Sequence, residues 1–342
     1  MKFGIFSLPT YYEEADGSVN DFYQRILTLL EEAEERGFDY AWANEHHFHP
    51  YGGMIPFPPV LLSAVAARTK RIRLGTSVTL PPLYHPLHVA EAYAMLDQIS
   101  GGRLDFGVGR GFVAFDYATF GVPLEEAQER LLESLEVILG CWQNRPFSHH
   151  GKYVNFDDVS VLPAPIQKPH PPVWMACTSN PEGFAYAGRH GFNLLTVVHV
   201  FPMEKLAGLI KLYRDAAAEA GHDPAKLQVS THYQVLCSES REQAVSQGIQ
   251  AIKRYGELNS AARQQGSATL IGRRDRDNPE ELIEGGRVCL GRPDDCVAVL
   301  KRAQETLGVD EVDCTFYFGG IDYATAQRSY ELFATEVMPK LR

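Results

Sequence analysis

Three of the four consecutive residues 46–49 are histidines, in the run Glu45-His46-His47-Phe48-His49. Imidazole changes its protonation state near neutral pH, so such a side chain can act as an acid or a base toward a reacting group. One buried histidine is readily explained by packing, but three so close together are not. The run follows the apolar residues 38–43, which predict a buried strand. We therefore expect an acid–base site directly after that strand.

The same histidines have a metal-binding interpretation. In an extended segment, His47 and His49 would point to the same side, a spacing that suits Zn²⁺, which needs further ligands from elsewhere in the chain. His85, His199 and His232 lie near the ends of later predicted strands, while no carboxylate follows in an obvious ligand position. A metal-dependent hydrolase is therefore the less favoured alternative.

A glycine-rich run at residues 107–111 follows a later predicted strand. Its spacing does not meet the G-x-G-x-x-G dinucleotide fingerprint. Small residues at a strand end would let a flat ring lie close to the backbone. Arg110 would then offer a fixed cation to a phosphate group, unless it is an ordinary surface or ion-paired arginine.

A second candidate phosphate-binding turn lies at residues 176–182. Thr178 and Ser179 precede a predicted helix, and the N-terminus of a helix attracts anions. Capping of that helix by Ser179 or Asn180 is an equally simple interpretation, and it does not exclude phosphate binding.

The elements that must position these residues alternate along the chain. Apolar runs typical of strands are followed by amphipathic runs typical of helices, giving about eight units and predicting a single (β/α)₈ barrel over residues 1–342. In such a barrel, functional residues lie at the carboxyl ends of the strands. The predicted strands are 3–8, 38–43, 71–80, 103–108, 173–176, 194–198, 228–236 and 311–316, and the predicted helices are 21–36, 58–69, 88–99, 124–142, 182–189, 203–220, 241–257, 296–306 and 323–338.

Two segments do not fit the alternation. Residues 147–172 are rich in proline and histidine and predict an extra hairpin or loop. Residues 259–287 form a long charged segment that includes a cluster of three arginines (273, 274 and 276) and two aspartates (275 and 277). This segment predicts either a mobile lid or a solvated insertion.

Composition limits the partners. The 342 residues are 45% hydrophobic and carry a formal net charge of −11, so we expect a globular protein that binds neither nucleic acid nor membrane. The longest apolar runs are far below the ~20 residues of a membrane span. The six cysteines are scattered without a C-x-x-C pair, which favours thiols and a cytoplasmic location.

Taken together, these motifs resemble the bacterial luciferase-like family of flavin-dependent monooxygenases, in particular its alkanal monooxygenase branch. The resemblance runs from Met1-Lys2-Phe3-Gly4 to Glu336-Val337-Met338-Pro339. Its most specific parts are Glu45-His46-His47-Phe48 and the stretch Asp97-Gln98-Ile99-Ser100-Gly101-Gly102-Arg103.

The resemblance implies a (β/α)₈ TIM barrel that takes reduced FMN from a separate flavin reductase. O₂ would form a C4a-peroxyflavin that oxygenates a small organic substrate. It further implies a homodimer formed through the early helices and a mobile lid at 259–287. His46 would be the catalytic acid or base, and the cofactor-binding residues would be Glu45, Ser77, Val78, Arg110, Thr178 and Ser179, with a cis peptide between Ser77 and Val78 under the ring.

The chain departs from the luciferases at two positions. Gly109 stands where they have a reactive cysteine beside the flavin, which leaves more space at the ring and means that the resemblance need not imply light emission. The run Cys177-Thr178-Ser179 replaces an acidic residue followed by serine in the phosphate-binding turn. A non-catalytic flavin-binding protein of the same fold and a deazaflavin-dependent oxidoreductase remain alternatives.

Overall fold

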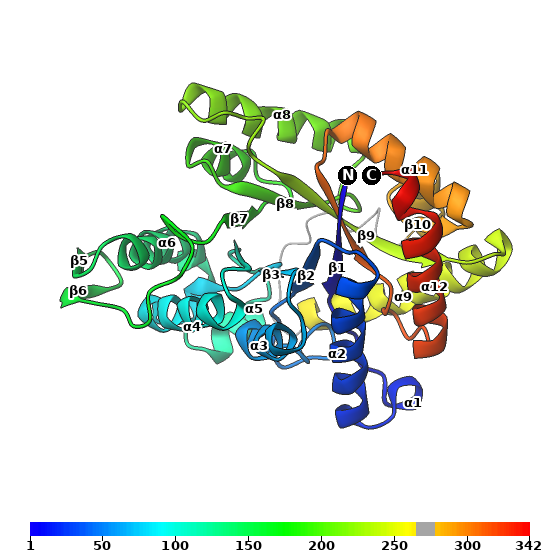
Figure 1. Cartoon of the computed structure of the whole chain (residues 1–342), viewed down its shortest axis with the longest axis horizontal. Helices are drawn as coiled ribbons and strands as arrows, with labels where there is room; N and C mark the ends of the chain where they lie inside the picture. Colours follow the sequence, from blue (N-terminus) through cyan, green and yellow to red (C-terminus); the bar gives the residue numbers. More distant parts are fainter. Residues whose placement is uncertain (265–277) are drawn as a thin grey trace.

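Eight parallel strands pair side by side and close into a barrel in the computed structural model, which describes residues 1–264 and 278–342. The first and last strands of the barrel pair with each other, as Phe3 lies opposite Val312. The predicted (β/α)₈ fold is therefore confirmed (Figure 1). In order around the barrel, its strands are β1 (Lys2–Ser7), β2 (Tyr40–Ala43), β3 (Arg73–Thr76), β4 (Leu104–Val108), β7 (Val173–Ala176), β8 (Asn193–Val197), β9 (Val229–Cys237) and β11 (Glu311–Thr315).

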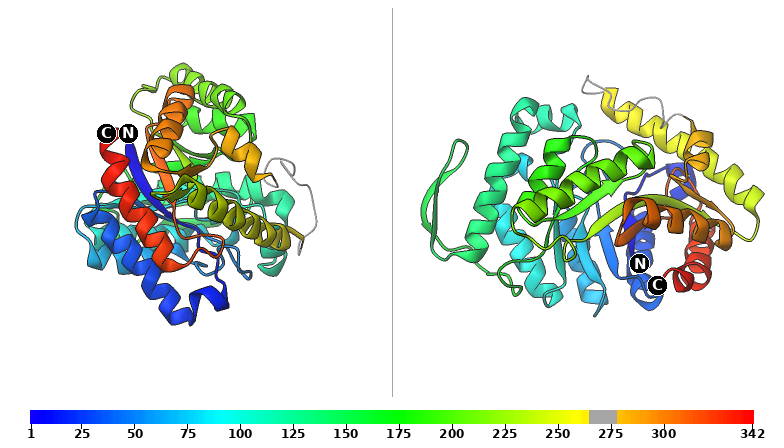
Figure 2. Two further views of the ribbon diagram at one scale, coloured as in Figure 1. Left: turned by 90° about the vertical axis from the view of Figure 1, so that its right-hand side faces the viewer. Right: turned by 90° about the horizontal axis from the view of Figure 1, so that it is seen from above.

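Helices surround the barrel, and three additional strands lie outside it (Figure 2). The helices are α1 (Glu13–Asp16), α2 (Val19–Glu35), α3 (Pro58–Arg68), α4 (Pro86–Ser100), α5 (Ala114–Thr119), α6 (Ala127–Gln143), α7 (Pro181–Arg189), α8 (Met203–Glu219), α9 (Arg241–Gln264), α10 (Pro279–Glu284), α11 (Pro293–Leu307) and α12 (Tyr323–Glu336), with 3₁₀ turns η1 (Pro81–Leu83), η2 (Leu124–Glu126) and η3 (Met338–Lys340). The additional strands are β5 (Phe147–His150), β6 (Asn155–Val159) and β10 (Cys289–Gly291). None of the described helices combines the length and apolar character needed to cross a bilayer.

The structure differs from the predicted elements in a few places. The extra hairpin is confirmed, since β5 and β6 pair antiparallel. Strand β3 ends at Thr76 instead of residue 80, and beyond it only Thr79 pairs again with β4, through a bridge to Val108. Helix α5 and strand β10 were not predicted, because six and three residues are too short for a periodic signal. The ends of the predicted lid belong to α9 and α10, and its residues 265–277, with the three arginines, lie outside the described residues.

The second family motif has a structural role around Arg103. Its guanidinium donates hydrogen bonds to the carbonyl oxygens of Ala66 and Thr69, at 3.0 and 3.1 Å, and to that of Ile72 at 2.9 Å. Gly101 ends α4 with a left-handed φ of 69°, a conformation that glycine adopts without steric cost. This motif therefore joins the end of α3 to the start of β4 and so fixes where β4 begins.

Aromatic side chains fill the barrel interior. The indole rings of Trp42 and Trp174 are fully buried and meet edge to face, with centroids 5.3 Å apart. Gly75 makes room for them, because a Cβ at this position would lie 2.1 Å from the ring of Trp42. Each indole nitrogen donates to a buried carboxyl group, Trp42 to Glu311 at 2.8 Å and Trp174 to Asp105 at 2.9 Å.

Glu311 and Asp313 form a buried pair of carboxyl groups in this interior. Burial and the neighbouring Asp313 raise the pKa of Glu311 well above its usual range, and burial also raises the pKa of Asp313. The Ser230 hydroxyl donates to Asp313 at 2.8 Å. Because a carboxyl group with a raised pKa binds its proton more tightly in the folded state, the protonated pair stabilises the fold at low pH. That stability is lost as the pH rises through the folded-state pKa.

Replacing Glu311 by glutamine should therefore change how stability depends on pH. Glutamine keeps an acceptor for the Trp42 indole but does not ionise. We expect the melting temperature of Glu311→Gln, relative to the wild type, to be higher at about pH 8 than at about pH 5. Thermal unfolding at both pH values measures this, with Asp157→Asn on the exposed hairpin as the control. A constant difference would show that the pair does not titrate in this range.

Candidate functional site

A cavity of about 540 Å³ lies at the carboxyl ends of the barrel strands. This volume falls within the range of pockets that bind cofactors and other small molecules. The chain segments that line it follow β2, β3, β4, β7 and β8, so residues far apart in the sequence meet there. All seven predicted site residues line this cavity, namely Glu45, His46, Ser77, Val78, Arg110, Thr178 and Ser179.

Glu45 connects the loop after β2 to the chain after β3. Its carboxylate is buried and accepts hydrogen bonds from the Thr79 hydroxyl at 2.6 Å and the Leu80 amide at 3.1 Å. Its other oxygen lies 3.1 Å from Nε2 of His47. Both oxygens are therefore held by groups of the protein. This arrangement fixes the loop that carries His46.

The three histidines of this loop point in different directions. His46 lines the cavity, with its ring 5.0 Å from that of Tyr51, whereas His47 contacts Glu45 and His49 faces a different buried carboxylate. The expectation that His47 and His49 share one side was wrong. Phe48 between them has a left-handed φ of 60°, so the segment is not extended.

Val78 and Gly109 lie against each other on one wall of the cavity. The peptide bond between Ser77 and Val78 is cis, as the resemblance implied. A Cβ at Gly109 would lie 2.6 Å from Cγ2 of Val78 and 3.6 Å from Cβ of Ala176. The expectation that Gly109 leaves more space at the ring was therefore wrong, because Val78 already takes that space. A side chain at 109 would require Val78 to shift.

Arg110 and the turn before α7 contribute several of the polar groups of the cavity. Arg110 is exposed, and its carbonyl oxygen accepts a hydrogen bond from Tyr117. Asn180 caps α7 by accepting from the Glu182 amide at 3.2 Å, so the Thr178 and Ser179 hydroxyls are not needed for capping. A cation and two hydroxyls at a helix N-terminus thus border one cavity, an arrangement that suits an anionic group.

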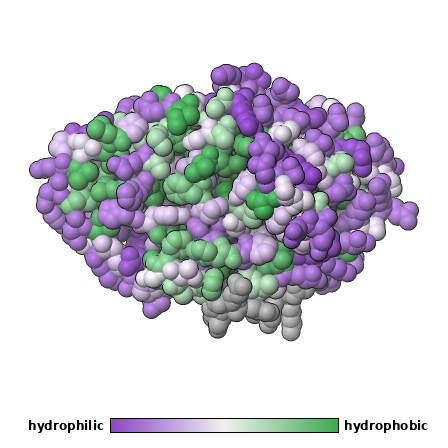
Figure 3. All heavy atoms as spheres, turned by 90° about the horizontal axis from the view of Figure 1, so that it is seen from below, coloured by the Kyte–Doolittle hydropathy of each residue, from purple (hydrophilic) through white to green (hydrophobic). Residues whose placement is uncertain are grey.

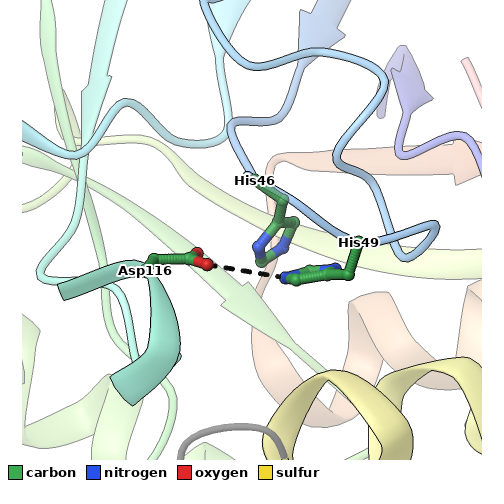
Figure 4. Close-up of side chains that lie close together, drawn as sticks. All are labelled: His46, His49 and Asp116. Atoms are coloured by element: carbon green, nitrogen blue, oxygen red, sulfur yellow. Dashed lines mark ion pairs between the residues drawn. The ribbon is translucent and has the colours of Figure 1, made fainter. Parts of the chain in front are cut away.

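Asp116, on the unpredicted helix α5, is a site residue that sequence analysis missed. Its carboxylate lies 3.8 Å from Nε2 of His49, and possible ligand atoms of His46, His49 and Asp116 all lie within 4.8 Å of one another (Figure 4). The statement that no carboxylate stands in a ligand position was therefore wrong. Only the tertiary packing of α5 against the histidine loop brings Asp116 there.

The histidines considered as further metal ligands lie elsewhere. His85 caps α4, as its Nδ1 accepts from the Leu87 amide at 3.3 Å. His199 and His232 line the far part of the cavity, where Nε2 of His232 is 2.9 Å from the Thr315 hydroxyl. Sequence analysis also missed Tyr51, which lines the cavity and whose hydroxyl is 2.9 Å from that of Tyr255 on α9.

Comparison with known protein families finds one match across most of the chain. The model of the luciferase-like monooxygenases matches residues 1–311. The chain is 28% identical over 333 residues to the oxygenase component of the flavin-dependent trigonelline monooxygenase of Acinetobacter baylyi, covering 93% of this chain and 89% of that protein. It is 33% identical over 234 residues to protein y4vJ of Sinorhizobium fredii, covering 67% of this chain and 65% of that protein.

Solved structures share the architecture. The monooxygenase RslO1 from Streptomyces bottropensis is 32% identical and superposes with a TM-score of 0.92 over 100% of both chains. The oxygenating constituent of 3,6-diketocamphane monooxygenase from Pseudomonas putida, in complex with FMN, superposes with a TM-score of 0.79 over 99% of this chain and 98% of that chain. At 23% identity, this second likeness concerns the fold alone.

The role of Glu45 can be tested through its partner Thr79. Thr79→Val keeps the shape of the side chain but removes the donor to the buried carboxylate, which should lower the free energy of unfolding by about 1–3 kcal/mol. Urea unfolding measures the loss. Thr335→Val, at an exposed threonine of α12, should change it by less than about 0.5 kcal/mol. Equal losses in the two variants would contradict the role assigned to Glu45.

Proposed function

The chain belongs to the luciferase-like monooxygenase family, and we propose that it is an FMN-dependent monooxygenase acting on a small organic substrate. The observation that carries this proposal is the meeting of His46, Arg110 and the Thr178-Ser179 turn around one cavity. An imidazole, a guanidinium and the N-terminus of α7 bordering one pocket of suitable size support this proposal.

The residues of this cavity fit FMN. Arg110, Thr178 and Ser179 would hold the phosphate, because a guanidinium and a helix N-terminus both favour an anion. The wall of Val78 and Gly109 would lie against the flat ring, since no side chain projects from position 109. Reduced FMN, when bound, would supply the electrons that activate O₂ for insertion into the substrate.

His46 is proposed as the acid–base group. It is half-buried, lines the cavity and stands on a loop that Glu45 holds in place through Thr79 and Leu80. A fixed imidazole can donate a proton to a reacting oxygen and recover it afterwards. Glu45 has both oxygens engaged within the protein, so we assign it the positioning of this loop, at the edge of the cofactor site.

A separate flavin reductase is the proposed source of reduced FMN. The trigonelline relative is named as an oxygenase component, which means that a second component serves it. The remainder of the cavity, beyond the FMN groups, combines Phe6 and Leu8 with Tyr51 and His232. These residues suit a substrate that is mostly apolar and carries a group able to accept or donate a hydrogen bond.

A homodimer is proposed through the outer face of α3 and α4. Val60, Met95 and Ile99 are 69%, 51% and 49% exposed, and hydrophobic side chains gather on the face over these helices (Figure 3). Exposed apolar patches commonly mark protein interfaces. The family resemblance favours a second copy of this chain as the partner that binds to this face.

Two substitutions should separate binding from catalysis. We expect Arg110→Ala to weaken FMN affinity by about 10-fold or more, because a charge-assisted contact to phosphate is lost. His46→Ala should leave affinity nearly unchanged and reduce turnover by ~10²–10⁴-fold. Fluorescence titration and product formation with a flavin reductase measure the two effects, with Arg328→Ala and His150→Ala as exposed controls.

Several outcomes would contradict the proposed function. Absence of FMN binding by the wild type, oxidised or reduced, would reject it. Tight flavin binding without oxygenation of any substrate, and without a change in flavin reoxidation on His46→Ala, would identify a flavin-binding protein that does not catalyse the reaction. Equal affinities in the wild type and Arg110→Ala would reject the phosphate assignment.

The dimer can be tested by light scattering. We expect a mass of twice the 38.2 kDa of one chain. Met95→Glu should yield the monomer, because burying an unpaired charge in an interface is costly. Leu212→Glu, at an exposed apolar residue of α8, should remain dimeric. A monomeric wild type, or a dimeric Met95→Glu variant, would argue against this interface.

A further inference from the structure

His49 and Asp116 form a buried pair at the edge of the cavity, which Asp116 helps to line. Their side chains are 3% and 2% exposed, and Nε2 of His49 lies 3.8 Å from Oδ1 of Asp116. The rings of His46 and His49 have centroids 5.8 Å apart, so His49 stands next to both the proposed acid–base group and the carboxylate. Figure 4 shows the three side chains pointing toward one another from the loop after β2 and from α5.

The polar atoms of this pair lack ordinary partners. Among the described residues, no hydrogen bond of ordinary geometry reaches either ring nitrogen of His49 or either carboxylate oxygen of Asp116, although backbone groups of Tyr51 and His47 lie close enough to shift their pKa values. Buried polar groups without partners are rare and costly, so such a pair calls for an explanation. A side-chain movement of about 1 Å, or one bridging water, would bring the two groups into hydrogen-bond contact.

We propose that Asp116 and His49 share a proton and exchange it with His46, and that both are positioning residues for the acid–base step. This inference rests on the proposed role of His46. The His49–Asp116 pair would be an internal proton source for His46, and it is separate from the residues that would hold FMN.

The environment of the pair raises the pKa of Asp116 and lowers the pKa of His49. Burial, opposed by His47 and aided by Glu45, raises the pKa of Asp116 to about 6. Burial lowers the pKa of His49 from its ordinary value, and the nearby His47 adds to this. Both shifts oppose the ordinary preference of a proton for imidazole over carboxylate, which makes proton transfer between the two groups easier. The titratable groups that face Asp116 among the described residues are Glu45, His46, His47, His49 and Tyr117.

The proton transfers balance without any further reactant. When His46 gives its proton to a reacting oxygen, the His49–Asp116 pair supplies one to the neutral imidazole and is left as neutral histidine and carboxylate. The pair regains a proton from water. Only N–H and O–H bonds break and form, so no oxidant or reductant takes part.

The decisive measurement is an NMR titration of the histidine side chains in the full chain without flavin. In the wild type, the resonances of both His46 and His49 should show an inflection near pH 6, where Asp116 titrates. In Asp116→Asn, the part of this inflection that reports Asp116 should disappear from both, and each imidazole should show only its own titration. Because the titration needs no flavin, its outcome is independent of whether the protein binds FMN.

The control is a matched histidine–aspartate pair on the surface. Asp157 lies 3.0 Å from His150, and both are largely exposed, so Asp157→Asn makes the same charge change far from the cavity. It should leave the His46 titration unchanged. If Asp116→Asn does not fold, His49→Gln serves instead, since it keeps the carboxyl group and should move the His46 inflection to higher pH.

Turnover provides a second readout, with FMN affinity measured in parallel. Asp116→Asn should lower turnover by about 10-fold, less than the ~10²–10⁴-fold loss of a directly acting group, and should flatten its pH dependence near pH 6. An identical His46 titration in the wild type and Asp116→Asn would overturn the proposal. So would stoichiometric zinc in the purified wild type that is lost in Asp116→Asn, because the three residues would then be metal ligands.

Discussion

The buried carboxylate of Glu45 ties together two segments that leave neighbouring barrel strands. A carboxylate in an apolar interior must have its oxygens satisfied, and here Thr79, Leu80 and His47 do so. The loop after β2 can therefore adopt only conformations that keep these contacts. The direction of His46 into the cavity, and the closeness of His49 to Asp116, both depend on this constraint.

The barrel itself brings the other cavity residues close together. Its parallel strands deliver all their carboxyl ends to one side, so the chain needs no special contacts to bring Arg110, Thr178 and His46 to one cavity. The interior that holds the strands apart is aromatic, and Trp42 fits only because position 75 is glycine. The two most specific family motifs thus differ in purpose. The histidine loop shapes the cavity, whereas Arg103 joins structural elements away from it.

The sequence predicted those cavity residues that come directly after a strand, because functional residues of a barrel lie at the carboxyl ends of its strands. His46, Arg110, Thr178 and Ser179 each follow an apolar run, and all four line the cavity. Prediction from the sequence failed where side-chain direction depends on one backbone angle, as at Phe48, which sends His47 and His49 to different partners. It also failed for Asp116, because a six-residue helix has no periodic signal and its contacts are purely tertiary. The family resemblance supplied the proposed cofactor, which spacing alone left open between flavin and metal.

The close approach of Val78 and Gly109 links two positions that are distant in the sequence. Because Cγ2 of Val78 occupies the volume that a side chain at 109 would need, the two sites cannot diverge independently. A cysteine at 109 would crowd this methyl group, and a smaller residue at 78 would relieve the contact. The effect of a substitution at one of these positions therefore depends on the residue at the other.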